Sequence, residues 1–214
     1  MPQVAEALIK AKNKGLVIPV VYNSSAYENV STLNMLDGLV DVYLPDMKYI
    51  DSRLSAEYSK APDYADVAKA AIHEMVRQTG KPEFFIVDDE LVKSGRVEAG
   101  IMKKGVIVRH LVLPGTTKDS KAVIKYLIDT YGDDIYISIM SQYTPFERLK
   151  KHPLLSRKVT RKEYNSVVDY AIDCGINNGF IQEGDVAEES FIPEFDYELS
   201  LIHISEPTRQ AEIS

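Results

Sequence analysis

Two short apolar segments near the N-terminus constrain the fold more than any other feature of this sequence. The first covers residues 16–22 and ends in the polar residues 23–25. The second covers residues 39–44 and is followed by Pro-Asp-Met-Lys at 45–48. A helical pattern at 30–36 separates them, which predicts two parallel strands side by side in one sheet. Because functional side chains gather at the carboxyl ends of such strands, the polar residues there are the first candidates for a site.

The alternation of strand and helix continues along the chain and predicts an α/β protein. Apolar runs predict strands at residues 105–113, 135–140 and 180–182, and helical periodicity predicts helices at 63–78, 118–131 and 160–173. A helix over residues 4–14 feeds the first strand, and residues 84–105 resemble a hairpin-like insertion. A chain that opens on a helix leading into a buried strand suggests that earlier strand–helix units precede it.

Composition indicates a cytoplasmic globular protein. The chain has 214 residues, of which 45% are hydrophobic and 27% charged, which suits one folded domain. A net charge of −7 argues against a nucleic-acid partner, and no apolar run is long enough to span a membrane. The N-terminus lacks the apolar core of a signal peptide, and one cysteine fits a reducing compartment.

Five ordered blocks of sequence carry a resemblance to a known family. They are YNSSAYE at 22–28, DGLVDVYLPDMKY at 37–49, GVIVRHLVLPG at 105–115, YISIMSQYTP at 136–145 and NGFIQEG at 178–184. Together they resemble the radical S-adenosylmethionine (SAM) proteins related to pyruvate formate-lyase activating enzyme, within an uncharacterised iron–sulfur branch. The resemblance implies the C-terminal portion of a (βα) partial TIM-like barrel, truncated at its N-terminal side.

The resemblance also divides the chain into two parts. Residues 1–198 correspond to a partial radical SAM barrel domain without the N-terminal cluster-binding region. Residues 199–214 resemble the translation of a sequencing adapter, so we expect a non-native tail there. The alternative for these residues is a natural flexible C-terminus.

Members of this family hold a 4Fe–4S cluster through Cys-x-x-x-Cys-x-x-Cys and cleave SAM reductively to a 5′-deoxyadenosyl radical that abstracts hydrogen. That motif is absent here, because the single cysteine, Cys174, lies far from any such spacing. The resemblance therefore implies an inactive fragment of an oxidoreductase, whose cluster and SAM belong to the full-length protein. It also implies a glycyl-radical enzyme or another protein as substrate, and an electron donor such as flavodoxin or ferredoxin.

Five residues of this chain match family positions that contact SAM, or stand where they could. Asp46 and Lys48 match an Asp-x-Lys in which the lysine pairs with the SAM carboxylate. Asn23 matches a strand-end asparagine, and Tyr143 ends a strand where relatives place a residue against the adenine. Arg109 lies within a strand, where an inward arginine could pair with an anion. The structural alternatives are ion pairs for the charged residues and a turn role for Asn23.

Two other functions remain open from the sequence. A non-radical barrel lyase or aldolase could use Lys48 as a Schiff-base nucleophile. Such a lysine must be desolvated and neutral, whereas the neighbouring Asp46 carboxylate favours the charged ammonium. The second alternative is a catalytically silent binding module that has lost its cluster loop. His110 is a lone histidine, which is more often structural than catalytic.

Overall fold

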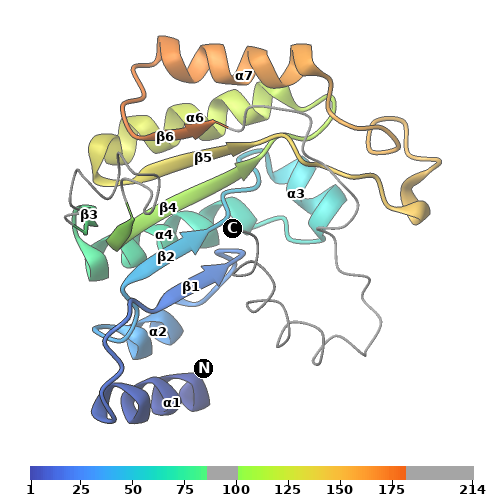
Figure 1. Ribbon diagram of the computed structural model, residues 1–214. Coiled ribbons are helices and arrows are strands. Elements are labelled where there is room, and N and C mark those ends of the chain that lie inside the picture. Colours follow the sequence, from blue (N-terminus) through green and yellow to red (C-terminus); the bar gives the residue numbers. More distant parts are fainter. Residues whose placement is uncertain (86–100, 182–214) are drawn as a thin grey trace, which may run out of the picture. The chain divides into compact units, whose positions relative to one another are not determined.

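In the computed structural model, the described residues form a sheet with five parallel strands in the order β1-β2-β4-β5-β6. The strands are β1 (Val21–Ser24), β2 (Val42–Pro45), β4 (Met102–Leu111), β5 (Tyr136–Met140) and β6 (Gly179–Ile181). Each pairs with the next parallel strand along the chain, so the chain advances across the sheet in one direction (Figure 1). A short strand, β3 (Glu83–Phe84), pairs antiparallel with the start of β4.

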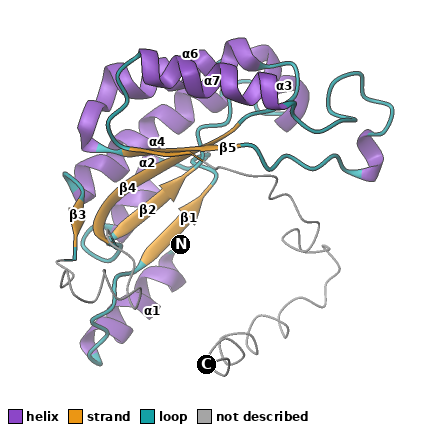
Figure 2. Cartoon of the chain, turned by 45° about the horizontal axis from the view of Figure 1, so that its top comes forward, coloured by secondary structure: helices purple, strands orange, loops and turns teal. Residues whose placement is uncertain are grey.

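The helices are α1 (Pro2–Asn13), α2 (Val30–Leu33), α3 (Ser52–Ser59), α4 (Tyr64–Thr79), α6 (Thr117–Tyr131) and α7 (Arg161–Asp173), with 3-10 turns η1 (Asn34–Leu36), η2 (Gly132–Asp134) and η3 (Glu147–Leu149). Helix α1 precedes β1, and the other helices follow the strands along the chain. Helices α2, α4, α6 and α7 lie on the same face (Figures 1 and 2). When consecutive parallel strands are joined by right-handed crossovers and each strand is added on the same side of the last, the connecting helices all lie on one face of the sheet. Within the described ranges, the opposite, concave face carries no helix (Figure 2).

The hydrophobic core lies between the sheet and these helices. Its fully buried side chains include Tyr43, Val108, Ile137 and Ile139 from the strands and Ile72, Met75, Ile124, Leu127 and Val167 from the helices. Burying one aliphatic side chain of this size contributes about 1.5–3 kcal/mol. Strand residues of the opposite parity face the other side of the sheet, which positions the polar side chains described below.

Four of the predicted helices are found within one or two residues of their expected bounds, whereas the segment predicted at 30–36 forms α2 only to Leu33 and continues as the 3-10 turn η1. The described residues also contain α3, which the pattern does not predict. Gly80, with φ of 68°, follows α4 at the expected stop. Helix α3 was not predicted, because its sequence has a weak apolar pattern. It begins after Asp51, whose carboxylate accepts a hydrogen bond from the N–H of Arg53 at 2.8 Å.

Helix α7 begins with the expected capping box. The hydroxyl of Thr160 accepts from the N–H of Glu163, and the Glu163 carboxylate accepts from the N–H of Thr160. Val167 and Ala171 are buried as predicted, whereas Ile172, expected on the same stripe, is 58% exposed. The helix therefore packs through a narrower face than the apolar pattern indicated.

The first strand is shifted from its predicted position. Val17 and Ile18 lie outside β1 and are 91% and 68% exposed. Pro19 has no N–H to donate, and pairing begins only at Val20, whose carbonyl accepts from the N–H of Val42 at 3.1 Å. The apolar run thus extends beyond the sheet and leaves exposed side chains beside its β1 edge.

The structure describes residues 1–85 and 101–181, all within one compact unit, Met1–Gly184. Most of the expected hairpin-like insertion, the predicted domain boundary at residue 198 and the tail at 199–214 lie outside the described residues. Among the described helices, none is both long and apolar enough to cross a membrane.

Candidate functional site

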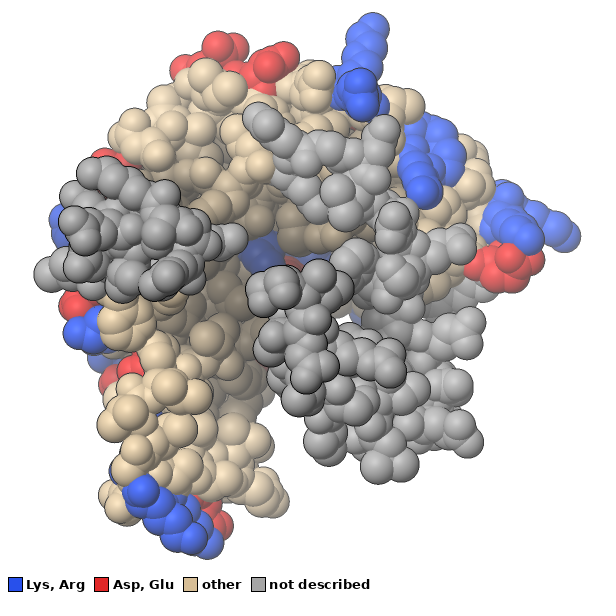
Figure 3. Space-filling model, viewed as in Figure 1, with Lys and Arg blue, Asp and Glu red and all other residues tan. Residues whose placement is uncertain are grey.

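Polar side chains of β1, β2 and β4 meet at the carboxyl ends of these strands. The register places Asp46, just after β2, opposite Arg109 of β4, and the end of β1 beside them carries Asn23. Strand alternation turns Arg109 toward the face without helices, and its neighbour His110 is buried at 1% exposure. On the face shown in Figure 3, charged side chains of both signs are visible on the concave side of the sheet, and others lie in separate groups at the periphery.

Arg109 joins the three strand ends through one terminal nitrogen. Its Nη2 donates to Oδ1 of Asp46 at 2.6 Å and to Oδ1 of Asn23 at 2.7 Å. The side chains of Arg109 and Asp46 are only 26% and 21% exposed, so this ion pair is stronger than a fully solvated one. Its Nε is buried, with no hydrogen-bond partner in the part of the chain described. Arg109 is therefore engaged mainly in holding the strand ends together.

Lys48 is the more available cation of the group. Its Nζ lies 3.9 Å from Oδ2 of Asp46, which is too long for a strong hydrogen bond, and its side chain is 41% exposed. Asp46 thus faces Arg109 with one oxygen and Lys48 with the other. The ammonium of Lys48 can bind an anionic group of a ligand, and the oxygens of Asp46 and Asn23 can accept hydrogen bonds from the same ligand.

The backbone that carries Lys48 is held by a buried histidine of β4. The N–H of Met47 donates to the carbonyl of Arg109 at 2.9 Å, and Nδ1 of His110 lies 2.8 Å from the carbonyl oxygen of Met47. Burial lowers the pKa of His110 to about 4, so the ring is neutral near pH 7 and Nδ1 carries the proton that it donates. His110 therefore has a structural role.

A second anchor holds the other end of the same segment. The carboxylate of Asp119, in α6, accepts from the N–H of Asp51 at 2.7 Å and from the N–H of Ile50 at 3.2 Å. Burial raises the pKa of Asp119, and these two backbone donors oppose that shift. The residues after Lys48 are thereby tied to the start of α6.

Tyr64 and Asp119 contact this segment and were not identified from the sequence. Tyr64 is the first residue of α4, and its hydroxyl contacts backbone groups after β1 and after β2. Nothing in the local pattern distinguishes Tyr64 from an ordinary core aromatic or Asp119 from a charged residue in the first turn of a helix. Their contacts arise only from the tertiary fold.

Four of the five predicted residues are brought together. Asn23, Asp46, Lys48 and Arg109 are linked by the contacts given above. Tyr143 is buried instead, at 7% exposure, and its hydroxyl donates to the carbonyl of Leu155 at 2.8 Å. Among described residues, no hydrogen bond or ion pair joins Tyr143 to the other four. A contact of Tyr143 with adenine stays a prediction.

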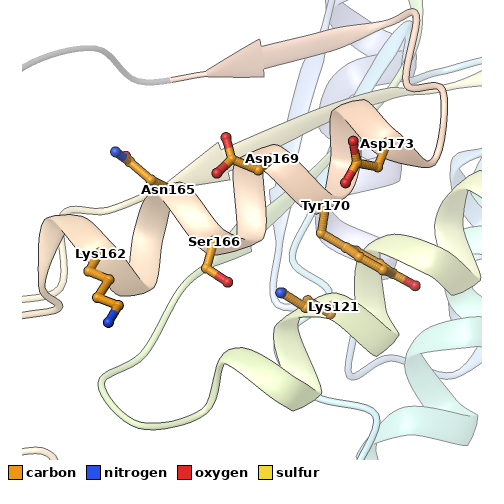
Figure 4. A pocket seen from close by; sticks show the side chains of 7 residues that line it. All are labelled: Lys121, Lys162, Asn165, Ser166, Asp169, Tyr170 and Asp173. Carbon is orange, nitrogen blue, oxygen red and sulfur yellow. The ribbon is translucent and has the colours of Figure 1, made fainter.

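A surface pocket lies elsewhere, between α6 and α7 (Figure 4). It is lined by Lys121, Lys162, Asn165, Ser166, Asp169, Tyr170 and Asp173. Nζ of Lys121 lies 5.4 Å from the centre of the Tyr170 ring, a cation–π contact. None of the predicted site residues lines this pocket, and its mixed charges do not select a ligand.

Metal-binding side chains do not converge within the described ranges. No group of three or more His, Cys, Asp or Glu residues there is placed to hold a metal ion. Cys174 is a free, half-buried thiol that follows α7.

Comparisons with known proteins support the fold. No family model matches the chain. It is 29% identical over 154 residues to uncharacterized protein MJ0674 of Methanocaldococcus jannaschii. The aligned region covers 72% of this chain and 38% of that protein. The chain thus spans little more than a third of that relative's length.

A solved structure has a similar arrangement of strands and helices. It is a domain of pyruvate-formate lyase-activating enzyme from Bacteroides vulgatus, with a TM-score of 0.52. The similarity covers 85% of this chain and 91% of that domain, at 11% sequence identity. The chain therefore has an α/β fold, with a parallel five-strand sheet, that resembles this domain.

Proposed function

We propose that this chain is the SAM-binding part of a radical SAM iron–sulfur protein resembling pyruvate formate-lyase activating enzyme. The observation that carries the proposal is that four polar side chains meet at the carboxyl ends of β1, β2 and β4: Asn23, Asp46, Lys48 and Arg109. Lys48, the least engaged cation, would pair with the SAM carboxylate. The similar fold of an activating-enzyme domain supports this assignment.

For the architecture, we propose that residues 1–198 are the C-terminal portion of a (βα) partial TIM-like barrel. A doubly wound sheet reverses its strand order and carries helices on both faces. Here the order runs one way and the helices lie on one face, as in a barrel wall. Val17, Ile18 and Val21, exposed by the β1 edge, would be covered by preceding strands. Residues 199–214 remain a proposed non-native tail.

The polar group at the strand ends fits the amino-acid part of SAM. Lys48 would hold the carboxylate, and the carboxylate of Asp46 and the amide oxygen of Asn23 would accept hydrogen bonds from amino or hydroxyl groups. Arg109 would keep Asp46 and Asn23 in place. When bound and reduced, SAM would supply a hydrogen-abstracting 5′-deoxyadenosyl radical.

The described residues do not fit a 4Fe–4S cluster. Such a cluster needs three thiolates for SAM chemistry, and the whole chain has one cysteine, Cys174. We assign no step of radical generation to this chain. The proposal puts the cluster ligands before Met1 in the natural protein, and it assigns the glycyl-radical partner and a flavodoxin or ferredoxin donor to that longer protein. A thiol triplet in the genomic sequence upstream would support this.

Replacing Lys48 with Ala tests the binding role. Losing a charge-assisted hydrogen bond costs about 1.5–3 kcal/mol, so we expect the Kd for SAM to rise about ten-fold or more. Methylthioadenosine lacks the amino-acid carboxylate, so its Kd should not change. Isothermal titration calorimetry on the chain and its variants measures both values.

Lys12→Ala is the matched control, because Lys12 makes a similar contact of 3.7 Å with Asp41 at the other end of the strands. Equal SAM affinity for Lys48→Ala and the unchanged chain would contradict the assignment. Borohydride trapping of a carbonyl compound on Lys48 would instead favour the lyase alternative. The 41% exposure of Lys48 does not favour that chemistry, which requires a desolvated amine.

A further inference from the structure

The hydroxyl of Tyr64 links the ends of β1 and β2 through three backbone groups. It accepts a hydrogen bond from the N–H of Lys48 at 3.1 Å. It has one proton to donate, and the carbonyl oxygens of Asp46 and Ser25 lie at 2.8 Å and 3.0 Å. Two of these groups belong to Asp46 and Lys48, and the third follows the strand that carries Asn23.

The ring of Tyr64 is fixed by its surroundings. It is 2% exposed, stacks on Tyr27 with ring centres 6.0 Å apart, and meets Tyr49 edge to face at 5.7 Å. Burial raises the pKa of Tyr64 well above its usual value, so the hydroxyl keeps its proton at neutral pH. A rigid ring with a protonated hydroxyl holds the two strand ends in one arrangement.

This contact matters because the rest of Lys48 is loosely held. Its side chain has four rotatable methylene groups and, among the residues that the structure describes, one long ion-pair contact, to Asp46. The region that its ammonium can reach therefore depends on the position of the Lys48 backbone, which Tyr64 holds directly. Asp119 holds the following N–H groups but contacts neither Asp46 nor Lys48 through any hydrogen bond among the described residues.

We propose that Tyr64 is a positioning residue that fixes the backbone of Asp46 and Lys48, so that the Lys48 side chain extends toward a ligand carboxylate from one backbone position. The inference rests on the proposed SAM binding and adds a residue that makes no contact with the ligand itself. Because Tyr64 fixes this backbone before a ligand binds, less conformational entropy is lost when Lys48 becomes ordered on binding.

Amide hydrogen exchange tests the backbone contact without any ligand. In Tyr64→Phe, we expect the N–H of Lys48 to exchange at least about ten-fold faster, since it loses its acceptor. Tyr49→Phe is the matched control, because it removes a hydroxyl from a neighbouring aromatic ring, and that hydroxyl accepts a hydrogen bond from Ser59 and not from the backbone of Lys48. Unchanged exchange at Lys48 in Tyr64→Phe overturns the proposal, whatever the result with SAM.

A double-mutant cycle then tests the link to the ligand. Tyr64→Phe should raise the Kd for SAM about ten-fold when Lys48 is present and have little effect when Lys48 is replaced by Ala. It should leave the Kd for methylthioadenosine unchanged. Equal weakening in both backgrounds, or of both ligands, would show a general structural role and overturn the positioning role.

The two arms separate this inference from the proposed function. If the unchanged chain does not bind SAM, the proposed function fails and the positioning role fails with it. The exchange experiment still decides whether Tyr64 fixes the backbone of Lys48. If SAM binds, but the effects of Tyr64→Phe and Lys48→Ala on the Kd for SAM are additive, the proposed function stands and the positioning role of Tyr64 is rejected.

Discussion

At the scale of single residues, His110 shows how a buried titratable group supports the segment after β2. Its Nδ1 lies 2.8 Å from the Met47 carbonyl, and its Nε2 is buried with no hydrogen-bond partner in the described structure. Protonation would place a charge in this apolar environment. Because burial lowers the pKa from 6.5 to about 4, the unfolded chain binds the proton first as the pH falls.

We predict that His110→Asn makes stability less dependent on pH. For His110, whose folded pKa is lowered, stability is fully present above pH 6.5 and declines as the pH falls toward 4. The decline between pH 7 and pH 4 should be about 3 kcal/mol. Asn keeps an N–H donor near the Nδ1 position and does not titrate. Urea unfolding at several pH values measures the difference, and parallel curves for both proteins would contradict it.

At the scale of elements, Glu163 ties the start of α7 to two loops. Besides the capping box, its Oε1 accepts from the N–H of Gly115 at 2.8 Å, and Arg157 donates to both of its oxygens. The hydrogen bonds from Arg157 are the main reason why the pKa of Glu163 lies well below its usual value. The carboxylate thus joins the loop after β4, the segment before α7 and the helix itself.

We predict that Glu163→Gln destabilises the chain by about 1–2 kcal/mol at pH 7, from loss of the charged cap. Because the folded pKa is lowered, this contribution is fully present above the ordinary value of 4.5 and is lost as the pH falls through the lowered value. The difference should therefore shrink in acid. Glu147→Gln, at an exposed Glu147–Lys150 pair, is the control and should change stability little. Thermal unfolding measures both.

At the scale of the whole molecule, β1 forms an exposed edge of the described sheet. Among the described strands, none pairs with the outer side of β1, and the side chains of Val17, Ile18 and Val21 beside it are exposed. Such an edge, without strands to cover it, favours association between copies of the chain.

We predict that the chain self-associates and that Val17→Lys with Ile18→Lys reduces this association, because charges on an edge oppose pairing. Ile172→Lys, also at an exposed isoleucine but on α7, should not reduce it. Sedimentation velocity at several concentrations distinguishes these variants. Equal association of the edge variant and the unchanged chain would contradict the prediction.

Much of the local structure could be predicted from the sequence. Periodicity located α4, α6 and α7, and the capping box at Thr160 and Glu163 was visible as a pattern of neighbouring residues. The placement of Asn23, Asp46 and Lys48 at strand ends also followed from the order of apolar and polar segments. These features depend on residues close together in the chain, so a local pattern records them.

The tertiary structure alone decided which distant residues meet. Ser25 and Tyr64 are 39 positions apart and Asp51 and Asp119 are 68, and no local pattern records such pairs. Whether Arg109 or His110 faced the open side depended on which face the helices cover. The apolar residues 16–22 predicted one buried strand, but β1 pairs with β2 only from Val21 onward, so the residues before it lie outside the sheet. Burial and long-range hydrogen bonds are properties of the packed chain, so these outcomes required the fold.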